Sequence, residues 1–169
     1  SPYEGGHRVP FFILWEEGGL KGGKDIDELS SYTDFLPTIA DLCGIKMTDK
    51  TDGLSLLPLL NNITGWKSRT LVVDTQREEF LKKGKQFAVM TDQWRLVGEE
   101  LYEIKKDPLQ ENDVANEFPE IVKNLQNSYE EWWLDVSQNK DEYERIVIGK
   151  DVPRHALTVH DCHMTKGYP

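Results

Sequence analysis

Residues 87–104 read FAVMTDQWRLVGEELYEI, in which short apolar runs alternate with turn residues. With one run further upstream, the strand-like segments are Thr70–Asp74, Phe87–Thr91, Trp94–Gly98 and Leu101–Ile104. Their branched and aromatic side chains favour β-strands, and Asp92-Gln93 forms a tight link of the kind found in hairpins. The pattern predicts a small antiparallel sheet.

A long amphipathic helix is predicted after this sheet. Apolar side chains recur there at alternating steps of four and three: Phe118, Val122, Leu125, Tyr129, Trp132 and Val136. Pro119 suits the first turn of a helix, where its missing N–H costs little. We expect the apolar side to cover the sheet and form an α+β unit. Trp132 is then expected in the core, while Trp133 is half exposed, where it covers the sheet edge or stacks on a sugar.

The N-terminal part has a different pattern. Residues 9–15, VPFFILW, are apolar throughout and lie between glycine pairs, which predicts a strand buried on both faces. A helix is expected next, capped by Thr33 or Asp34 and ended by Gly44. Its apolar face is expected to comprise Phe35, Leu36, Ile39, Leu42 and a buried Cys43. A second short helix is expected over residues 54–60.

Three regions follow from these patterns. Residues 1–65 are expected to carry the last strand and helices of a larger domain, and residues 66–138 a subdomain made of the sheet and its helix. Residues 139–169 form a tail without a clear assignment.

The composition excludes several classes of function. The 169 residues include 20 Lys and Arg against 30 Asp and Glu, for a formal charge of −10. Binding to nucleic acid needs a concentrated basic face, so we expect no nucleic-acid partner. No run approaches the roughly 20 apolar residues of a membrane span. The two cysteines are far apart, with no spacing typical of a zinc site.

The segment Tyr3–Arg8, YEGGHR, is the first candidate for a functional site. Gly5 and Gly6 allow the backbone to pass close to a bulky group or to adopt positive φ. Glu4 and Arg8 flank them and can pair across the turn. The segment is either a structural entrance to the following strand or a loop that faces an active-site crevice, with His7 in reach of a substrate.

Several pieces of the chain resemble the C-terminal portion of the formylglycine-dependent sulfatases. YEGGHRVP is similar to the family's Tyr-Glu-Gly-Gly-x-Arg-x-Pro segment. The later pieces that match in order are Ser31–Ile39 with Leu42–Ile45, Asp52–Leu60, Arg69–Leu71, Trp94–Val97, and Glu100–Ile104 with Asp107-Pro108 and Glu111-Asn112. Together they cover about two thirds of the chain.

The resemblance implies an alkaline-phosphatase-like α/β fold for the whole protein, which would hydrolyse sulfate esters on small molecules or carbohydrates. It also implies a calcium ion and a formylglycine nucleophile made from Cys or Ser in a Cys/Ser-x-Pro-x-Arg motif. Neither Cys43 nor Cys162 stands in such a motif, and the family's calcium ligands lie mostly in its N-terminal half. The chain alone is therefore expected to bind no metal and to be inactive. A periplasmic, extracellular or lysosomal location would accord with the family.

The family's sulfate-binding lysine should lie just before Ser1, which places Tyr3, Glu4, Gly5, Gly6 and Arg8 near the site as a structural motif. This comes from the resemblance alone.

A second candidate site is the tail with His160, His163 and Lys166. Two imidazoles and a cation can hydrogen-bond sugar hydroxyls or a sulfate. The alternatives are solvated loop histidines or a metal pair, although no third ligand is evident nearby.

Two other functions remain open. The parent protein could be a phosphodiester or phosphonate hydrolase of the same superfamily, or the chain could be a non-catalytic module that binds carbohydrate or protein. The apolar run 9–15, without strands on either side, would also expose apolar surface, so self-association of the isolated chain is expected.

Overall fold

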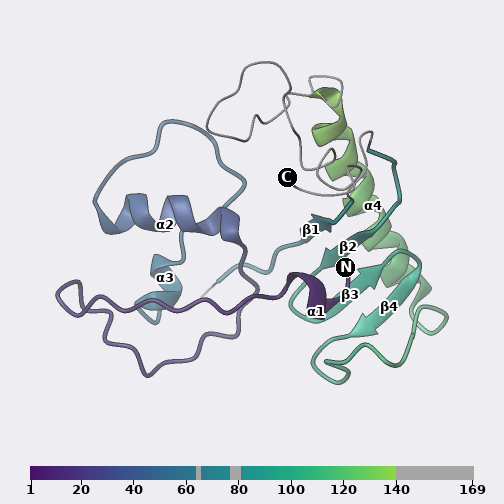
Figure 1. Ribbon diagram of the computed structural model, residues 1–169, viewed down its shortest axis with the longest axis horizontal. Helices are drawn as coiled ribbons and strands as arrows, with labels where there is room; N and C mark the ends of the chain where they lie inside the picture. Colours follow the sequence, from purple (N-terminus) through teal and green to yellow (C-terminus); the bar gives the residue numbers. More distant parts are fainter. Residues whose placement is uncertain (64–65, 77–80, 140–169) are drawn as a thin grey trace, which may run out of the picture.

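The computed structural model describes residues 1–63, 66–76 and 81–139. The elements in chain order are α1 (Glu4–His7), a 3₁₀ turn (Tyr32–Asp34), α2 (Phe35–Leu42), α3 (Leu57–Leu60), β1 (Leu71–Asp74), β2 (Phe87–Met90), β3 (Trp94–Val97), β4 (Glu100–Glu103), α4 (Pro119–Val136) and a last 3₁₀ turn (Ser137–Asn139). Figure 1 shows α2 and α3 to one side of the sheet.

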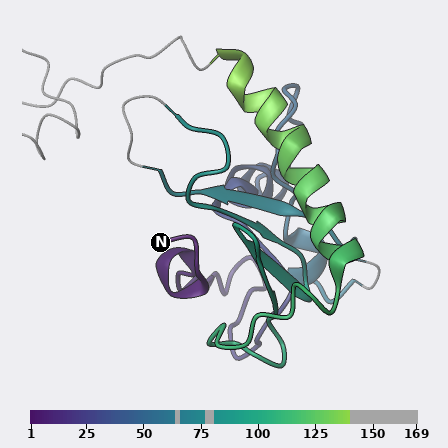
Figure 2. The same ribbon diagram turned by 90° about the vertical axis from the view of Figure 1, so that its right-hand side faces the viewer.

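The four strands form an antiparallel sheet in the order β1-β2-β3-β4. Leu96 of β3 pairs with Val89 of β2 and with Leu101 of β4. Helix α4 runs along one face of this sheet, and α1 lies at the opposite face (Figure 2). The expected α+β architecture with a covering helix is confirmed.

The core lies between the sheet and α4. Val89, Leu96 and Leu101 are fully buried there, and α4 contributes Leu125 and Tyr129. The Tyr129 ring stacks on Phe87 of β2 with the ring centroids 3.9 Å apart. On the opposite face, a smaller cluster comprises Ala88, Val97 and Tyr102. Since β2 is buried on both faces, it is the central apolar strand of the described chain.

The expected roles of the two tryptophans in α4 are wrong. Trp133 is buried and Trp132 is only partly buried. The buried residues of the helix, Leu125, Tyr129 and Trp133, follow one another at steps of four, whereas the predicted seam took a step of three after Tyr129. Side chains four residues apart lie on the same side of a helix, so Trp133 continues the row that faces the sheet. It is therefore a core residue and not a sugar platform.

The predicted strand at residues 9–15 is also wrong. Its only β pairing in the described chain is a bridge between Trp15 and Leu20, and Val9 and Phe12 are 74% and 91% exposed. The glycine-pair turn before it is a one-turn helix, α1. A buried strand needs partner strands for its backbone groups and layers on both faces, and the described chain supplies neither.

Helix α2 forms where a helix was expected, with two differences. Asp34 is its N-cap residue, as one of the two predicted, but makes no side-chain cap bond to α2; its carboxylate instead accepts from the Ser31 N–H in a capping box that closes the preceding 3₁₀ turn. Gly44, at φ +66°, ends it as predicted. Phe35, Leu36 and Ile39, expected in the core, are exposed, and so is Cys43. Pro37, Thr38 and Ala40 are buried in their place, because that side of α2 faces the 53–59 segment.

In the described part of the chain, none of the helices is both long and apolar enough to cross a membrane. The boundary expected near residue 65 stays a prediction.

Leu96→Ala is expected to lower the free energy of unfolding of the sheet by about 2–5 kcal/mol, because it leaves a cavity at a fully buried site. Urea denaturation followed by tryptophan fluorescence measures the change. Leu109, which is 76% exposed, provides the matched control, and Leu109→Ala should change stability by less than about 0.5 kcal/mol. Equal effects of the two substitutions would contradict this description of the core.

Candidate functional site

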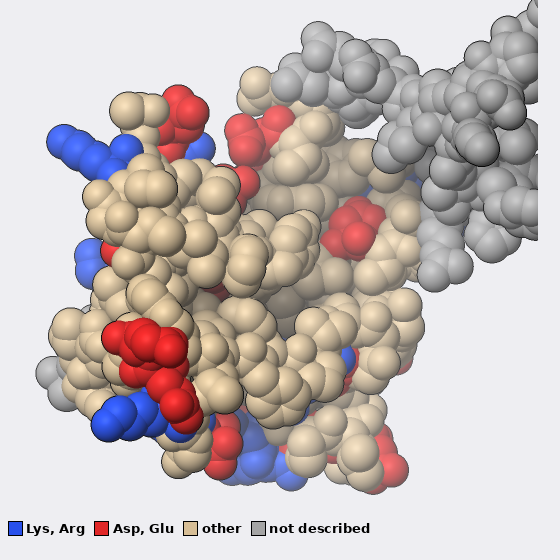
Figure 3. All heavy atoms as spheres, turned by 60° about the vertical axis from the view of Figure 1, so that its left-hand side comes forward, with Lys and Arg blue, Asp and Glu red and all other residues tan. Residues whose placement is uncertain are grey.

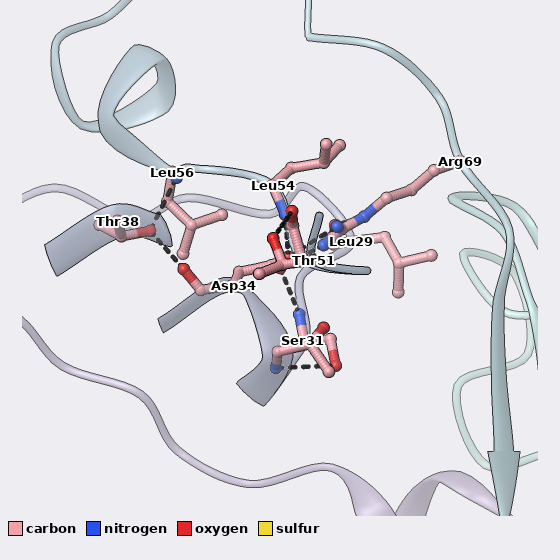
Figure 4. Close-up of polar contacts among 10 residues, drawn as sticks. Leu29, Ser31, Asp34, Thr38, Thr51, Leu54, Leu56 and Arg69 are labelled. Atoms are coloured by element: carbon pink, nitrogen blue, oxygen red, sulfur yellow. Dashed lines mark hydrogen bonds and ion pairs between the residues drawn. The ribbon is translucent and has the colours of Figure 1, made fainter. Parts of the chain in front are cut away.

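The Asp34 carboxylate is the most completely enclosed charged group described. It is fully buried, and the Arg69 guanidinium donates to both of its oxygens. The backbone N–H of Leu54 donates to Oδ1 at 2.8 Å and that of Ser31 to Oδ2 at 2.7 Å. Figure 4 shows these donors converging on Asp34 from separate segments. Each oxygen accepts two hydrogen bonds, so no direction is left for a substrate or proton.

The same network continues into α2. The Thr38 hydroxyl donates to the Asp34 carbonyl at 2.6 Å and accepts from the Leu56 N–H at 2.9 Å (Figure 4). Gly53 lies so close to the chain before α2 that a Cβ there would stand 2.0 Å from the Thr33 carbonyl oxygen. The segments Asp34–Thr38 and Gly53–Leu56 are thus joined by one network of hydrogen bonds and close backbone contacts.

The pKa of Asp34 is set by two opposing effects, burial and hydrogen bonding. Burial alone would raise it, but the hydrogen bonds from Arg69, Leu54 and Ser31 outweigh burial and hold the pKa below its ordinary value. The carboxylate is therefore charged at neutral pH and acts as a structural anion, not as a general acid.

A second buried carboxylate joins the YEGGHR segment to the sheet. Glu4, in α1, accepts from the Arg95 Nε of β3, although 91 residues separate them. The Glu4 N–H also donates to the Gln110 Oε1 at 2.8 Å. The neighbouring His7 ring and then Arg95 lower the pKa of Glu4 to about 2, against the opposing effect of burial. Glu4 is therefore an anion at any physiological pH.

Tyr3 adds a third contact between α1 and the sheet. Its hydroxyl donates to Glu100 Oε2 at 2.5 Å, and the Tyr102 hydroxyl donates to the same oxygen at 2.8 Å. The hydrogen bond to Glu100 raises the pKa of Tyr3, and burial followed by that same carboxylate raises the pKa of Tyr102. Both phenols are therefore neutral donors that hold Glu100 between them.

His7 and Arg8 lie differently from the sequence expectation. The His7 side chain is only 13% exposed, its Nε2 lies 3.7 Å from Glu4 Oε1, and neither ring nitrogen has a hydrogen-bond partner among the described residues. Arg8 approaches Glu4 only to 3.9 Å and its side chain is 75% exposed. The predicted pairing across the glycines therefore exists but is secondary to Arg95. As α1 stands, Arg8 is the cation of the motif that solvent can reach.

The prediction from the sequence paired Glu4 with Arg8 and missed the residues that hold Glu4 and Tyr3, which are Arg95, Gln110 and Glu100. A signal was present for one of them, because Arg95 stands inside the apolar run WRLV. A charged side chain in a buried strand needs a partner. The second candidate site, His160, His163 and Lys166, lies outside the described residues.

Two hollows among the described residues contain none of the motif. One, of about 320 Å³, lies between the 24–28 segment and α3 and is bordered by Trp66. The other, of about 420 Å³, lies beside Gly84 and Tyr129 at the edge of α4. No group of three His, Cys, Asp or Glu side chains that could hold a metal ion occurs in residues 1–63, 66–76 and 81–139.

Comparisons with known proteins agree with this arrangement. A family model described as N-sulphoglucosamine sulphohydrolase, C-terminal, matches residues 2–135, which include both buried ion pairs. The chain belongs to the sulfatase family and corresponds to its C-terminal portion. The resemblance on which the sequence analysis relied is confirmed.

Individual relatives are also sulfatases. The chain is 33% identical to an arylsulfatase of Clostridium perfringens over 99% of its length and 32% of that protein's. It is 29% identical to a Delta 4,5-hexuronate-2-O-sulfatase of Bacteroides thetaiotaomicron over all of its length and 35% of that protein's. The match to arylsulfatase K of Rattus norvegicus, at 29%, covers 74% of this chain and 24% of that protein. The chain thus spans about a quarter to a third of the length of these relatives.

A solved structure shows the same fold. The structure of a 2-O GAG sulfatase matches 73% of this chain and 29% of its own with a TM-score of 0.55, at 23% sequence identity. This likeness supports the sheet and the covering helix as a sulfatase fold.

Arg69→Met is expected to destabilise the region around α2 by about 3–5 kcal/mol, because it leaves the buried Asp34 carboxylate without its countercharge. Amide hydrogen exchange in α2 measures the change. Arg8→Met removes an exposed guanidinium and should leave that exchange unchanged.

The pH dependence provides a second readout. The lowered pKa of Asp34 stabilises the folded chain above the carboxyl's unfolded pKa, and this stability is lost as the pH falls through the folded value. Without Arg69 the folded pKa rises, so exchange in α2 should accelerate at a higher pH than in the wild type. Identical pH profiles would show that Asp34 does not depend on Arg69.

Proposed function

We propose that this chain is the C-terminal part of a sulfatase that hydrolyses sulfate esters on sulfated carbohydrates. The family match across residues 2–135 is the observation that carries the proposal. Two relatives are described as a Delta 4,5-hexuronate-2-O-sulfatase and a 2-O GAG sulfatase, which favours a sulfated uronate within an oligosaccharide as the substrate class.

In this proposal the chain serves as scaffold and rim rather than as the reacting centre. Calcium and a formylglycine, when present in the whole protein, supply the charge stabilisation and the nucleophile. The residues of this chain hold the YEGGHR segment at the sheet through Glu4 and Tyr3, and Arg8 projects from it into solvent. An exposed guanidinium suits an oxyanion such as a sulfate or a carboxylate, whose oxygens can accept two parallel hydrogen bonds.

His7, His160, His163 and Lys166 remain proposed substrate contacts. In the described structure the ring nitrogens of His7 are inaccessible, so His7 would reach a substrate only if α1 shifted. Arg8 is therefore the stronger candidate within the motif.

The full-length protein is expected to release sulfate from an unsaturated 2-O-sulfated uronate disaccharide, and chelation of divalent metal should abolish the release. Ion chromatography of free sulfate measures it. The isolated 169-residue chain should release none, since it has no Cys/Ser-x-Pro-x-Arg motif. Cleavage of phosphodiesters by the full-length protein without sulfate release would favour the phosphodiester hydrolase, and release by the isolated chain would contradict its expected inactivity.

An exposed apolar surface supports the idea that further protein covers this chain. We call it the apolar face, and it comprises Val9, Phe11, Phe12, Leu14, Trp15, Phe35, Leu36 and Ile39, all exposed. The Phe11 and Phe35 rings meet edge to face with their centroids 6.5 Å apart, which joins the two segments. In Figure 3 a broad uncharged surface occupies much of the side that carries these segments. Exposed apolar side chains gathered in this number are typical of interaction sites.

The isolated chain is therefore expected to self-associate through the apolar face at micromolar concentration. Light scattering should show dimers or larger species, and Phe12→Asp combined with Leu36→Asp should shift them toward monomer. Leu109→Asp, at an exposed residue outside the apolar face, is the control and should leave the association unchanged. A monodisperse wild-type monomer would rule out this role for the surface.

A further inference from the structure

Helix α1 has little capacity to hold its own shape. It has four residues, two of which are glycines, and no side chain caps its N-terminus. A single helical turn fixes several dihedral angles for one hydrogen bond, and glycine increases the entropic cost. The conformation of the YEGGHR segment therefore depends on contacts from outside the segment.

Contacts to Glu4 and Tyr3 come from the face of the sheet opposite α4 (Figure 2), and the loop after β4 adds one more. The central one is Arg95, which is 8% exposed. Its Nη1 donates to the carbonyls of Thr91 and Trp94, which fixes the guanidinium at the turn between β2 and β3. Its Nε is then left to donate to Glu4.

The contact between Arg95 and Glu4 depends on the direction of its hydrogen bonds as well as on charge. Two backbone carbonyls of its own hairpin hold the Arg95 guanidinium, so its position is fixed by contacts other than those with α1. Gln110 fixes the N–H of the same glutamate from a third segment, the loop after β4. The Glu4 carboxylate and backbone are thus both determined by the sheet subdomain, and Arg8 follows four residues later in the same turn.

We propose that Arg95 is a positioning residue for the sulfatase reaction, acting through Glu4 to hold the YEGGHR turn in its working geometry. This inference rests on the proposed function, in which the turn borders the bound substrate. It assigns a role in turnover to a strand residue of the sheet subdomain that itself touches no substrate. Misplacement of a reacting or binding group by about 1 Å can cost two orders of magnitude in rate, so a loose turn should be visible in turnover.

The test uses the full-length protein with the 2-O-sulfated disaccharide. Arg95→Met is expected to lower kcat by about tenfold to a hundredfold while KM changes by less than about threefold. In the same variant, amide exchange of residues 3–8 should accelerate, whereas exchange in β2, β3 and α4 stays protected, because their apolar core does not include Arg95. Lys106→Met is the control, since Lys106 forms an exposed ion pair with Glu103 on the same sheet.

Glu4→Gln tests the same contact without altering the sheet, because it changes the partner on α1 and leaves β3 intact. It should lower kcat as well, and the double variant Arg95→Met with Glu4→Gln should be no worse than the more damaged single variant. Independent, multiplicative losses would show that Arg95 does not act through Glu4 and would overturn the proposal.

Two further outcomes are distinct. Faster exchange at residues 3–8 with unchanged kcat would make the contact purely structural and overturn the positioning role. A wild-type protein that releases no sulfate from any ester would instead refute the proposed function, and the positioning role with it.

Discussion

The ion pair between Asp34 and Arg69 is the interaction on which the arrangement of the residues before the sheet depends. A buried carboxylate without a countercharge would cost several kcal/mol, so the segments that supply its donors must meet. Arg69, Ser31 and Leu54 do so, and Arg69 also donates to the Leu29 carbonyl at 3.0 Å. Because Arg69 stands two residues before β1, the pair also sets where the sheet begins relative to α2.

The sheet with α4 and the region around α2 are therefore stabilised in different ways. The sheet and α4 enclose an apolar core with fully buried Leu96 and Leu101, and the hydrophobic effect that stabilises it has no preferred direction. The region around α2 buries little apolar surface of its own and relies on directed hydrogen bonds to Asp34 and Thr38. Directed contacts hold backbone segments in one geometry but respond to pH and to the loss of a single partner.

The sequence predicted the sheet and α4 closely, because their periodicity is local and their burial is supplied within the same 70 or so residues. The prediction for residues 9–15 failed for the opposite reason. An unbroken apolar run favours burial on both faces, but the described residues supply no layers that cover it. The same argument applies to Phe35, Leu36 and Ile39 on α2, which were assigned to a core that the described residues do not form.

The motif of the candidate site was predictable from the sequence, but the residues that hold it in place were not. The glycines of YEGGHR and the charges beside them are visible in the printed sequence, whereas the pairing of Glu4 with Arg95 spans 91 residues and leaves no local pattern. The swapped roles of Trp132 and Trp133 show a smaller limit of the same kind. A shift of one residue in the predicted apolar row of a helix changes which of two neighbouring rings is buried.

The ion pair between Glu4 and Arg95 has a physical consequence for the YEGGHR turn. A glycine-containing turn is useful beside a substrate because its backbone can approach closely, but the same glycines leave it without stiffness of its own. The described chain resolves this conflict by placing the rigid partner elsewhere, on a strand whose fold is secured by an apolar core. Arg95 joins the two, because its guanidinium donates to two carbonyls of the hairpin and also to the Glu4 carboxylate. The turn is therefore ordered by its contacts with β3 and with the loop after β4, because its own four residues have no cap and only one helical turn.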